Sequence, residues 1–310
     1  MQSSPEQPYM QLAVMSRWYV VSRAIQVMAS LGVANYMSNN PISIEQLATA
    51  TNTKPQLLDR LMRFLSAYKI FKQYPEGYSL TPLSQPLRDD DPHSMRDVLS
   101  IVDDSWWEAF AQLENNLISG EPAFNLQHQD NFFSFLNKHP EKQDKFMQGM
   151  GKLSGFDNDA ISKAFNFGSL DGVVTMMSDA ALGTSLINHY PNLTVSHVNR
   201  DSVITNAPNA QGYLFKGILH DFNDEGIRSL LSKLGQQMPA DGKLFIAEQV
   251  IPEDSEPHTN KTMDIIMMVL LGGQQRTISE WCQVIESAGF CFNQSYPTQS
   301  LFTLMEFSRL

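Results

Sequence analysis

The chain has 310 residues, of which 42% are hydrophobic and 10% aromatic, so it can bury a large core and build two domains, and a disordered protein is excluded. Its net charge of −11 disfavours nucleic acids and anionic membranes as partners, because both expose negative phosphate groups. With Cys282 and Cys291 as its only cysteines, the chain cannot form a disulfide framework or a multi-cysteine zinc site.

The first residues, MQSSPEQPYMQ, are polar, and Arg17 and Arg23 interrupt the apolar stretch that follows them. Neither a signal peptide nor a membrane span has this pattern, so we expect a soluble, cytoplasmic protein. Residues 10–38 carry apolar side chains at helical spacing, up to a turn at residues 39–41. This apolar face is wide enough to need a partner.

Residues 42–50 and 55–68 predict two further helices, and the second has Pro55 near its first turn and a row of leucines on one face. Residues 70–81, IFKQYPEGYSLT, alternate like a short hairpin. Helices followed by a small hairpin indicate a winged helix. Basic residues outnumber acidic ones within residues 41–80, but the charge of the whole chain makes DNA an unfavourable partner.

Residues 94–150 look helical and are rich in aromatic side chains. From about residue 170 the pattern changes to short apolar strands separated by helices, which is typical of an α/β domain. The predicted strands are DGVVTMM, LTVSHV, GYLFKGIL and GKLFIAEQVI. We therefore expect a winged helix at 1–95, a helical linker at 96–160 and a Rossmann-like α/β domain at 161–310.

The segment GYLFKGILHDFNDE, residues 212–225, is the strongest functional signal. Its apolar run predicts a buried strand whose C-terminal end presents His220 and Asp221. Ligands bind at that end of the strands in open α/β sheets. The alternative interpretation is a structural histidine at a strand end, next to an acidic helix start. His189 and His197 have no ligand-like spacing, so we expect no metal site.

Several segments carry a family resemblance. They are ISIEQLATAT, LLDRLMRFLSAYKIF with YSLTPLS, FMQGMGKLSG, KGILHDFNDE, LFIAEQVIP and DIIMMVLLGGQQRTISEWCQVIESAGF. With them, residues 12–305 resemble the S-adenosylmethionine-dependent small-molecule O-methyltransferases of the caffeate and hydroxyindole type. The resemblance implies a homodimer, with residues 1–95 as a winged-helix dimerisation domain and residues 96–160 as a linker and acceptor-pocket segment. It also implies an α/β fold in which residues 161–310 form a Rossmann-like class I methyltransferase domain.

The resemblance also implies catalytic roles. His220 matches the family's general base, which takes the proton of an acceptor hydroxyl, and Glu248 matches the carboxylate that orients this histidine. Where the family has a second flanking acid, this chain has Gln275, which keeps a hydrogen bond but loses the charge.

The acceptor pocket is implied by four apolar positions. Phe146, Met150 and Met267 match residues that clamp an aromatic acceptor, and Phe222 stands where the family usually has tryptophan. We therefore expect a small-molecule ligand, aromatic or polyketide-like. The alternative is that these side chains are plain core.

The cofactor region departs from the family pattern. The family's glycine-rich turn falls on about residues 176–180, MMSDA, and the acid that grips the ribose is replaced by Asn199. About 20 residues, a strand and its loop, are missing before GYLFKGIL. Lys216 and, as a weaker match, Asp221 remain as cofactor contacts. We expect S-adenosylmethionine to bind weakly or not at all.

Three functions remain compatible with these residues. The first is a cofactor-independent acid–base catalyst of a rearrangement, elimination or decarboxylation. The second is a noncatalytic dimer partner or small-molecule binder. The third is an S-adenosylmethionine-dependent methyltransferase with an unusual cofactor site. The residues favour the noncatalytic role by a small margin, because the cofactor region has lost three features.

Overall fold

A computed structural model of the chain describes residues 7–176, 180–198 and 207–310. The chain divides into two compact units. Unit 1 comprises Met1–Asp103 and His139–Lys152, and unit 2 comprises Asp104–Lys138 and Leu153–Leu310. Helix α10 (Pro140–Ala164) contributes residues to both units, which are described separately below.

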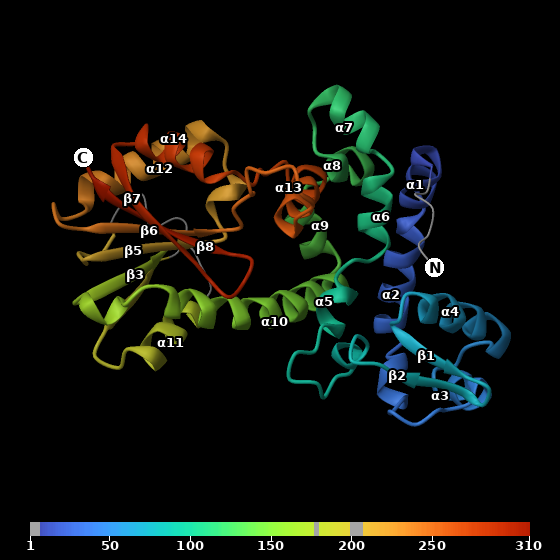
Figure 1. Cartoon of the computed structure of the whole chain (residues 1–310). Coiled ribbons are helices and arrows are strands. Elements are labelled where there is room, and N and C mark those ends of the chain that lie inside the picture. Colours follow the sequence, from blue (N-terminus) through green and yellow to red (C-terminus); the bar gives the residue numbers. More distant parts are fainter. Residues whose placement is uncertain (1–6, 177–179, 199–206) are drawn as a thin grey trace. The chain divides into compact units, whose positions relative to one another are not determined.

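Unit 1 has the expected winged-helix composition of short helices and one hairpin (Figure 1). Besides the first half of α10, its elements are α1 (Pro8–Met15), α2 (Trp18–Ser30), η1 (Val33–Tyr36), α3 (Ile44–Ala50), α4 (Pro55–Ala67), β1 (Phe71–Tyr74), β2 (Gly77–Leu80), η2 (Gln85–Leu87) and α5 (Arg96–Ser100). The helical pattern expected over residues 10–38 is divided between α1, α2 and η1. Gly32, in the left-handed conformation at φ +63°, separates α2 from η1.

Local sequence signals explain the helix–helix–hairpin part of unit 1. Ser43 and Gln46 form a reciprocal capping box at the start of α3. Pro55 occupies the first turn of α4, where its missing N–H costs nothing. The inner face of α4, with Leu58 and Leu65, packs into the core of this unit together with Tyr78 of β2.

Unit 2 is built on a six-stranded sheet with the order β4-β3-β5-β6-β8-β7. Its strands are β3 (Gly172–Met176), β4 (Thr194–Val198), β5 (Gly212–Lys216), β6 (Lys243–Glu248), β7 (Phe290–Pro297) and β8 (Thr303–Arg309). Strands β4, β3, β5 and β6 are parallel, while β8 runs antiparallel to both β6 and β7. The parallel strands therefore end at one edge of the sheet.

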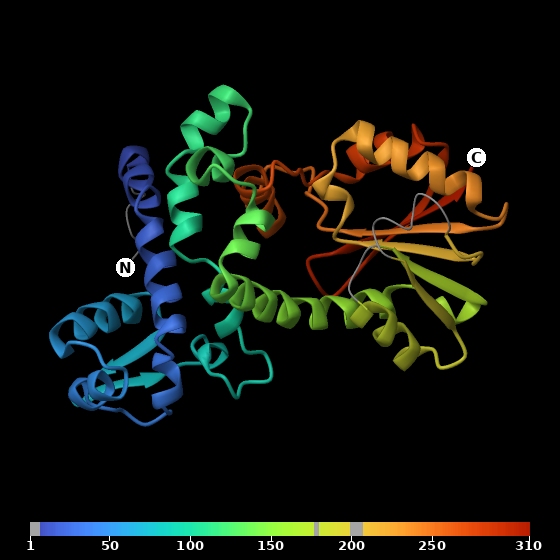
Figure 2. The same ribbon diagram turned by 180° about the vertical axis from the view of Figure 1, so that it is seen from behind.

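Helices cover both faces of this sheet, as Figures 1 and 2 show from opposite sides. The helices of unit 2 are α6 (Asp104–Phe110), α7 (Leu113–Ser119), α8 (Ala123–His128), α9 (Phe132–Lys138), η3 (Phe167–Ser169), α11 (Ala180–His189), η4 (Leu219–Asp221), α12 (Asp224–Gln237), α13 (Thr259–Leu270) and α14 (Ile278–Glu286). One core packs α12 and α14 against the sheet, and a second core packs α11 and the end of α10 against the opposite face. Because β5 is buried on both faces, its sequence is a continuous apolar run.

The expected loss of a strand is confirmed for the part of the chain that the structure describes. Strand β4 is the last strand at its side of the sheet, and residues 207–211, which lead into β5, form no strand. The region assigned to the glycine turn is only partly described. Met176 ends β3 and is buried in the core, Ala180 begins α11, and residues 177–179 lie outside the described residues, as does Asn199.

Candidate active site

His220 lies just beyond the C-terminal end of β5, in a single 3-10 turn. Strand β5 ends at Lys216, and Gly217 follows in the left-handed conformation at φ +61°. His220 is the central residue of η4, which follows directly. The predicted strand through residue 219 is therefore three residues too long, because left-handed Gly217 ends the ladder and the apolar Ile218 and Leu219 belong to the turn region.

Glu248 holds this turn in place from the neighbouring strand. It ends β6, which pairs with β5 in parallel, and its side chain is fully buried. Its Oε1 accepts hydrogen bonds from the backbone N–H groups of Ile218 at 3.0 Å, Leu219 at 2.8 Å and His220 at 3.4 Å. These donors stabilise a carboxylate that has no access to water.

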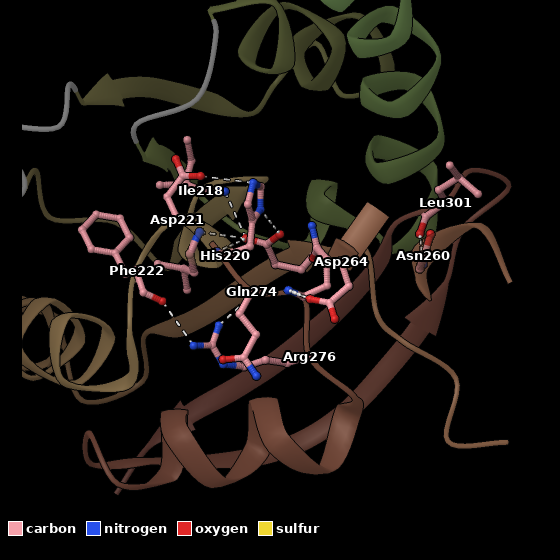
Figure 3. A network of polar contacts seen from close by, with 12 residues as sticks. Ile218, His220, Asp221, Phe222, Asn260, Asp264, Gln274, Arg276 and Leu301 are labelled. Carbon is pink, nitrogen blue, oxygen red and sulfur yellow. Dashed lines mark hydrogen bonds and ion pairs between the residues drawn. The ribbon is translucent and has the colours of Figure 1, made fainter. Parts of the chain in front are cut away.

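The expected hydrogen bond between Glu248 and His220 is present. Glu248 Oε2 lies 2.8 Å from His220 Nδ1, so the other ring nitrogen, Nε2, is the one left to exchange a proton with a ligand. Asp221 Oδ1 lies 3.4 Å from that Nε2 (Figure 3). The imidazole is thus placed between two carboxylates.

This arrangement shifts the pKa of His220. Burial of the ring lowers it, but the charge and hydrogen bond of Glu248, together with the charge of Asp221, raise it by more. The pKa of His220 therefore lies above its ordinary value of 6.5, and Arg276 only partly opposes the rise. His220 holds a proton at a higher pH than a free histidine does.

The loop between α13 and α14 packs against the histidine turn. The N–H of Gln274 donates to the carbonyl oxygen of His220 at 2.9 Å. Gly273 allows this approach, because a Cβ at this position would lie 2.8 Å from the same oxygen. The N–H of Gln275 donates to Asp264 Oδ1 at 2.8 Å, and burial raises the pKa of Asp264.

Gln275 itself is buried, and its amide oxygen has no hydrogen-bond partner among the described residues. An unsatisfied buried oxygen is costly, which indicates that a water or a ligand donor completes the site. The sequence placed Gln275 beside the histidine. It did not single out Asp264, on α13, which accepts the backbone bond that fixes Gln275.

Arg276 is a second residue that the sequence did not single out. It is buried above the ring of Trp281, and its guanidinium donates to Asp224 Oδ1 at 2.8 Å. The guanidinium also donates to the carbonyl of Phe222 at 3.2 Å (Figure 3). It therefore ties the segment after His220 to the start of α14. The sequence feature that could have identified Arg276 is an arginine in the predicted glycine turn, directly before the start of a helix.

The residues expected at the cofactor have other contacts. Lys216 is buried, and its Nζ donates to Ser154 Oγ at 2.8 Å and to Asn158 Oδ1 at 2.7 Å, both on α10. Its charge also partly offsets the burial that raises the pKa of Asp157. Asp221 contacts His220.

The four residues expected to clamp an acceptor lie in different units. Phe146 and Met150 belong to the part of α10 in unit 1, whereas Met267, on α13, and Phe222 belong to unit 2. Phe222 packs against the core between the sheet and α12. Within unit 2, Met267 is half-buried, one helical turn after Asp264, which fixes the loop beneath His220.

Two other kinds of site find no support in the described residues. No group of three or more histidine, cysteine, aspartate or glutamate side chains is arranged to hold a metal ion there. Within the same residues, no helix is both long and apolar enough to cross a membrane.

Comparison with family profiles gives two matches. Residues 14–89 match an O-methyltransferase dimerisation domain, and residues 194–291 match an O-methyltransferase domain. Among curated proteins, the chain is 28% identical to phenazine O-methyltransferase PhzM of Lysobacter antibioticus, over 93% of this chain and 92% of that protein. It is 24% identical to the mitomycin biosynthesis 6-O-methyltransferase of Streptomyces lavendulae, over 89% of this chain and 87% of that one.

Solved structures give the same fold. The crystal structure of LaPhzM superimposes with a TM-score of 0.86 at 27% identity, covering 98% of this chain and all of that one. Human N-acetylserotonin methyltransferase, solved in complex with S-adenosylmethionine, gives a TM-score of 0.87 at 19% identity, covering 100% of this chain and 99% of that one. At that identity the second likeness concerns the fold alone.

Proposed function

The chain belongs to the O-methyltransferase family, and from that premise we propose that His220 and Glu248 are an acid–base pair that acts on a hydroxyl group of a small organic molecule. The molecule is aromatic or polyketide-like. The observation that carries the proposal is the 2.8 Å contact between Glu248 Oε2 and His220 Nδ1 in a buried setting. A histidine kept only for packing needs no buried carboxylate partner.

In the first step a proton moves from the ligand to His220. The ligand O–H proton passes to Nε2 of His220, and the imidazolium that forms is stabilised by Glu248 at Nδ1. Because Asp221 already lies 3.4 Å from Nε2, the ligand hydroxyl must share or displace that contact. The oxyanion that results can drive a rearrangement, an elimination or a decarboxylation.

The family's cofactor, S-adenosylmethionine, does not fit the residues of this region well. The sequence of residues 176–180, MMSDA, contains no glycine, whereas the family's turn uses glycine to let backbone amides approach the cofactor. The ammonium of Lys216 is bonded to α10, and β4 ends the sheet in the described residues. These observations support weak binding, with a dissociation constant above about 1 mM.

Methyl transfer is the second candidate. The relatives favour it, since the similar curated proteins are named as methyltransferases. The noncatalytic role, which the sequence favoured by a small margin, is less well supported, because it leaves the buried pair of His220 and Glu248 without a purpose.

Calorimetry with S-adenosylmethionine and with S-adenosylhomocysteine separates these candidates. We expect no heat of binding below about 1 mM for either compound. A dissociation constant in the low micromolar range would overturn the weak-site proposal and make methyl transfer the function. With a ligand found by screening, His220→Ala should abolish turnover while changing affinity by less than about tenfold, because a base acts mainly in the transition state.

The assembly and location follow from the same premise. We propose a homodimer through the dimerisation domain, in the cytoplasm.

A noncatalytic protein would bind the screened ligand without turning it over, and His220→Ala would then change neither property.

A further inference from the structure

One groove of unit 1 lies on the winged helix. It has a volume of about 540 Å³ and is formed by the end of α4, by β1 and by the residue after β2. Its polar lining consists of Arg63, Ser66, Lys69, Lys72, Gln73 and Thr81, and we call it the basic groove. No acidic residue lines it, in a chain whose net charge is −11.

The three cations of the basic groove form no ion pair with a described residue. The nearest acid in sequence to Arg63 is Asp59, one helical turn earlier, and Asp59 accepts the hydroxyl of Tyr78 at 2.6 Å. Lys72 Nζ lies 4.7 Å from the ring centre of Tyr74, and its hydrogen bond lowers the pKa of that tyrosine. The positive charge of the groove is therefore not neutralised within the described chain.

Lys69 stands at a backbone position that favours glycine. It follows α4 in the left-handed conformation, at φ +61°. Its N–H donates to the carbonyl of Ser66 at 3.0 Å, and its own carbonyl accepts from Thr81 Oγ1 at 3.0 Å. These backbone bonds need no side chain, so a glycine would make them without the strain that a lysine has in the left-handed conformation. A strained residue of this kind points to a function.

We propose that the basic groove binds a phosphorylated ligand of nucleotide size, with Arg63, Lys69 and Lys72 on the phosphate oxygens. Arginine can bind two oxygens at once, and the lysines act as point charges. Ser66 and Gln73 supply further donors. The aromatic residue among those that line the groove is Phe71, which is only 1% exposed, so the phosphates carry the recognition. This site is separate from His220 and independent of the function proposed above.

Titration of the full-length protein with four probes tests the proposal. We expect ATP and inorganic tripolyphosphate to bind, adenosine not to bind, and the affinity to fall severalfold when salt rises from about 50 to about 200 mM. No binding of either phosphate probe at about 1 mM would overturn the proposal. A short DNA duplex that binds far more tightly than ATP would overturn the small-ligand assignment and give the groove to nucleic acid.

Matched variants separate binding from folding. Lys69→Gly removes the charge and relieves the left-handed strain, so we expect its melting temperature to stay the same or rise while affinity for tripolyphosphate falls about fivefold. Arg63→Ala should also weaken binding. Arg60→Ala, on the same helix but outside the groove, is the control. An equal loss in Arg60→Ala, or no loss in Lys69→Gly and Arg63→Ala, would contradict the proposal.

Discussion

At the scale of single residues, the site depends on Glu248, whose two carboxyl oxygens bind different parts of the histidine turn. Glu248 Oε1 orders the backbone of the histidine turn, and Oε2 orients the ring. The same residue therefore fixes the place of His220 and the state of its Nδ1. These contacts explain why a fully buried carboxyl group is tolerated at the end of β6, since hydrogen bonds satisfy both of its oxygens.

The raised pKa of His220 makes stability depend on pH. Its protonated form stabilises the folded protein fully below pH 6.5, and this contribution is lost as pH rises through the higher folded-state pKa. We expect the free energy of unfolding to fall across that window by up to about 1.4 kcal/mol per pH unit. Urea unfolding of the wild type and of His220→Gln, compared at several pH values, measures it. Parallel curves for the two proteins would contradict the prediction.

Glu248→Gln tests the role of the carboxylate. The amide can still accept from the backbone, but its NH₂ group would donate to Nδ1 and leave the proton on Nε2, the wrong tautomer for a base. We expect the pKa of His220 to fall and turnover of a screened ligand to drop by about 10² to 10⁴. NMR titration of the ring measures the first effect. Glu256→Gln, at an exposed site, should leave the titration unchanged.

At the scale of elements, the site is a contact between two loops. The turn after β5 carries His220, and the loop before α14 supports it through the bond from Gln274. Thr277 and Glu280 form a capping box at the start of α14, so this loop is fixed at its far end. The support depends on Gly273, which has no side chain to hold the loops apart.

Gly273→Ala should therefore move the histidine turn. Its Cβ would lie 2.8 Å from the carbonyl oxygen of His220, closer than real contacts allow. We expect a loss of about 1–3 kcal/mol in the free energy of unfolding and a changed titration of His220. Gly155→Ala is the matched control, because a Cβ there meets nothing within 4 Å. Equal stability and equal titration curves in both variants would show that the loops adapt.

At the scale of the whole molecule, the N-terminal helices expose a large apolar surface. Tyr9 is 70% exposed, Leu12 69%, Trp18 53% and Tyr19 61%, and α1 has no buried residue. Isolated exposed apolar side chains are ordinary, but a continuous run of them marks an interface. Residues 10–38 thus present an exposed apolar face, and the sequence predicted that this face needs a partner.

We expect light scattering to give twice 34.9 kDa at micromolar concentration, as for a two-fold dimer. Leu12→Asp combined with Trp18→Asp should produce a monomer or insoluble protein, because charges would be buried at the interface. Leu57→Asp, at a leucine on α4 that is 58% exposed, is the control. A wild-type mass of 34.9 kDa would rule out the dimer.

The sequence alone determined the fold. Period-2 and helical apolar patterns, Pro55 and the run GYLFK are local signals, and each predicted an element that the structure contains. The family resemblance also implied that one strand of the family's sheet is missing from the chain between β4 and β5, and the sheet of the described residues has six strands with β4 at its edge. The match of His220 with Glu248 was predictable, because neighbouring parallel strands end at the same edge.

Only the tertiary structure decided how that edge is assembled. The end of β5 at left-handed Gly217, the three backbone bonds to Glu248, and the support from Gln274 join residues far apart in the chain. A local pattern carries no information about such contacts. The groove cations were visible in the sequence as a local excess of charge, but their common groove depends on how α4 packs beside β1. Packing between elements, rather than propensity within them, sets these positions.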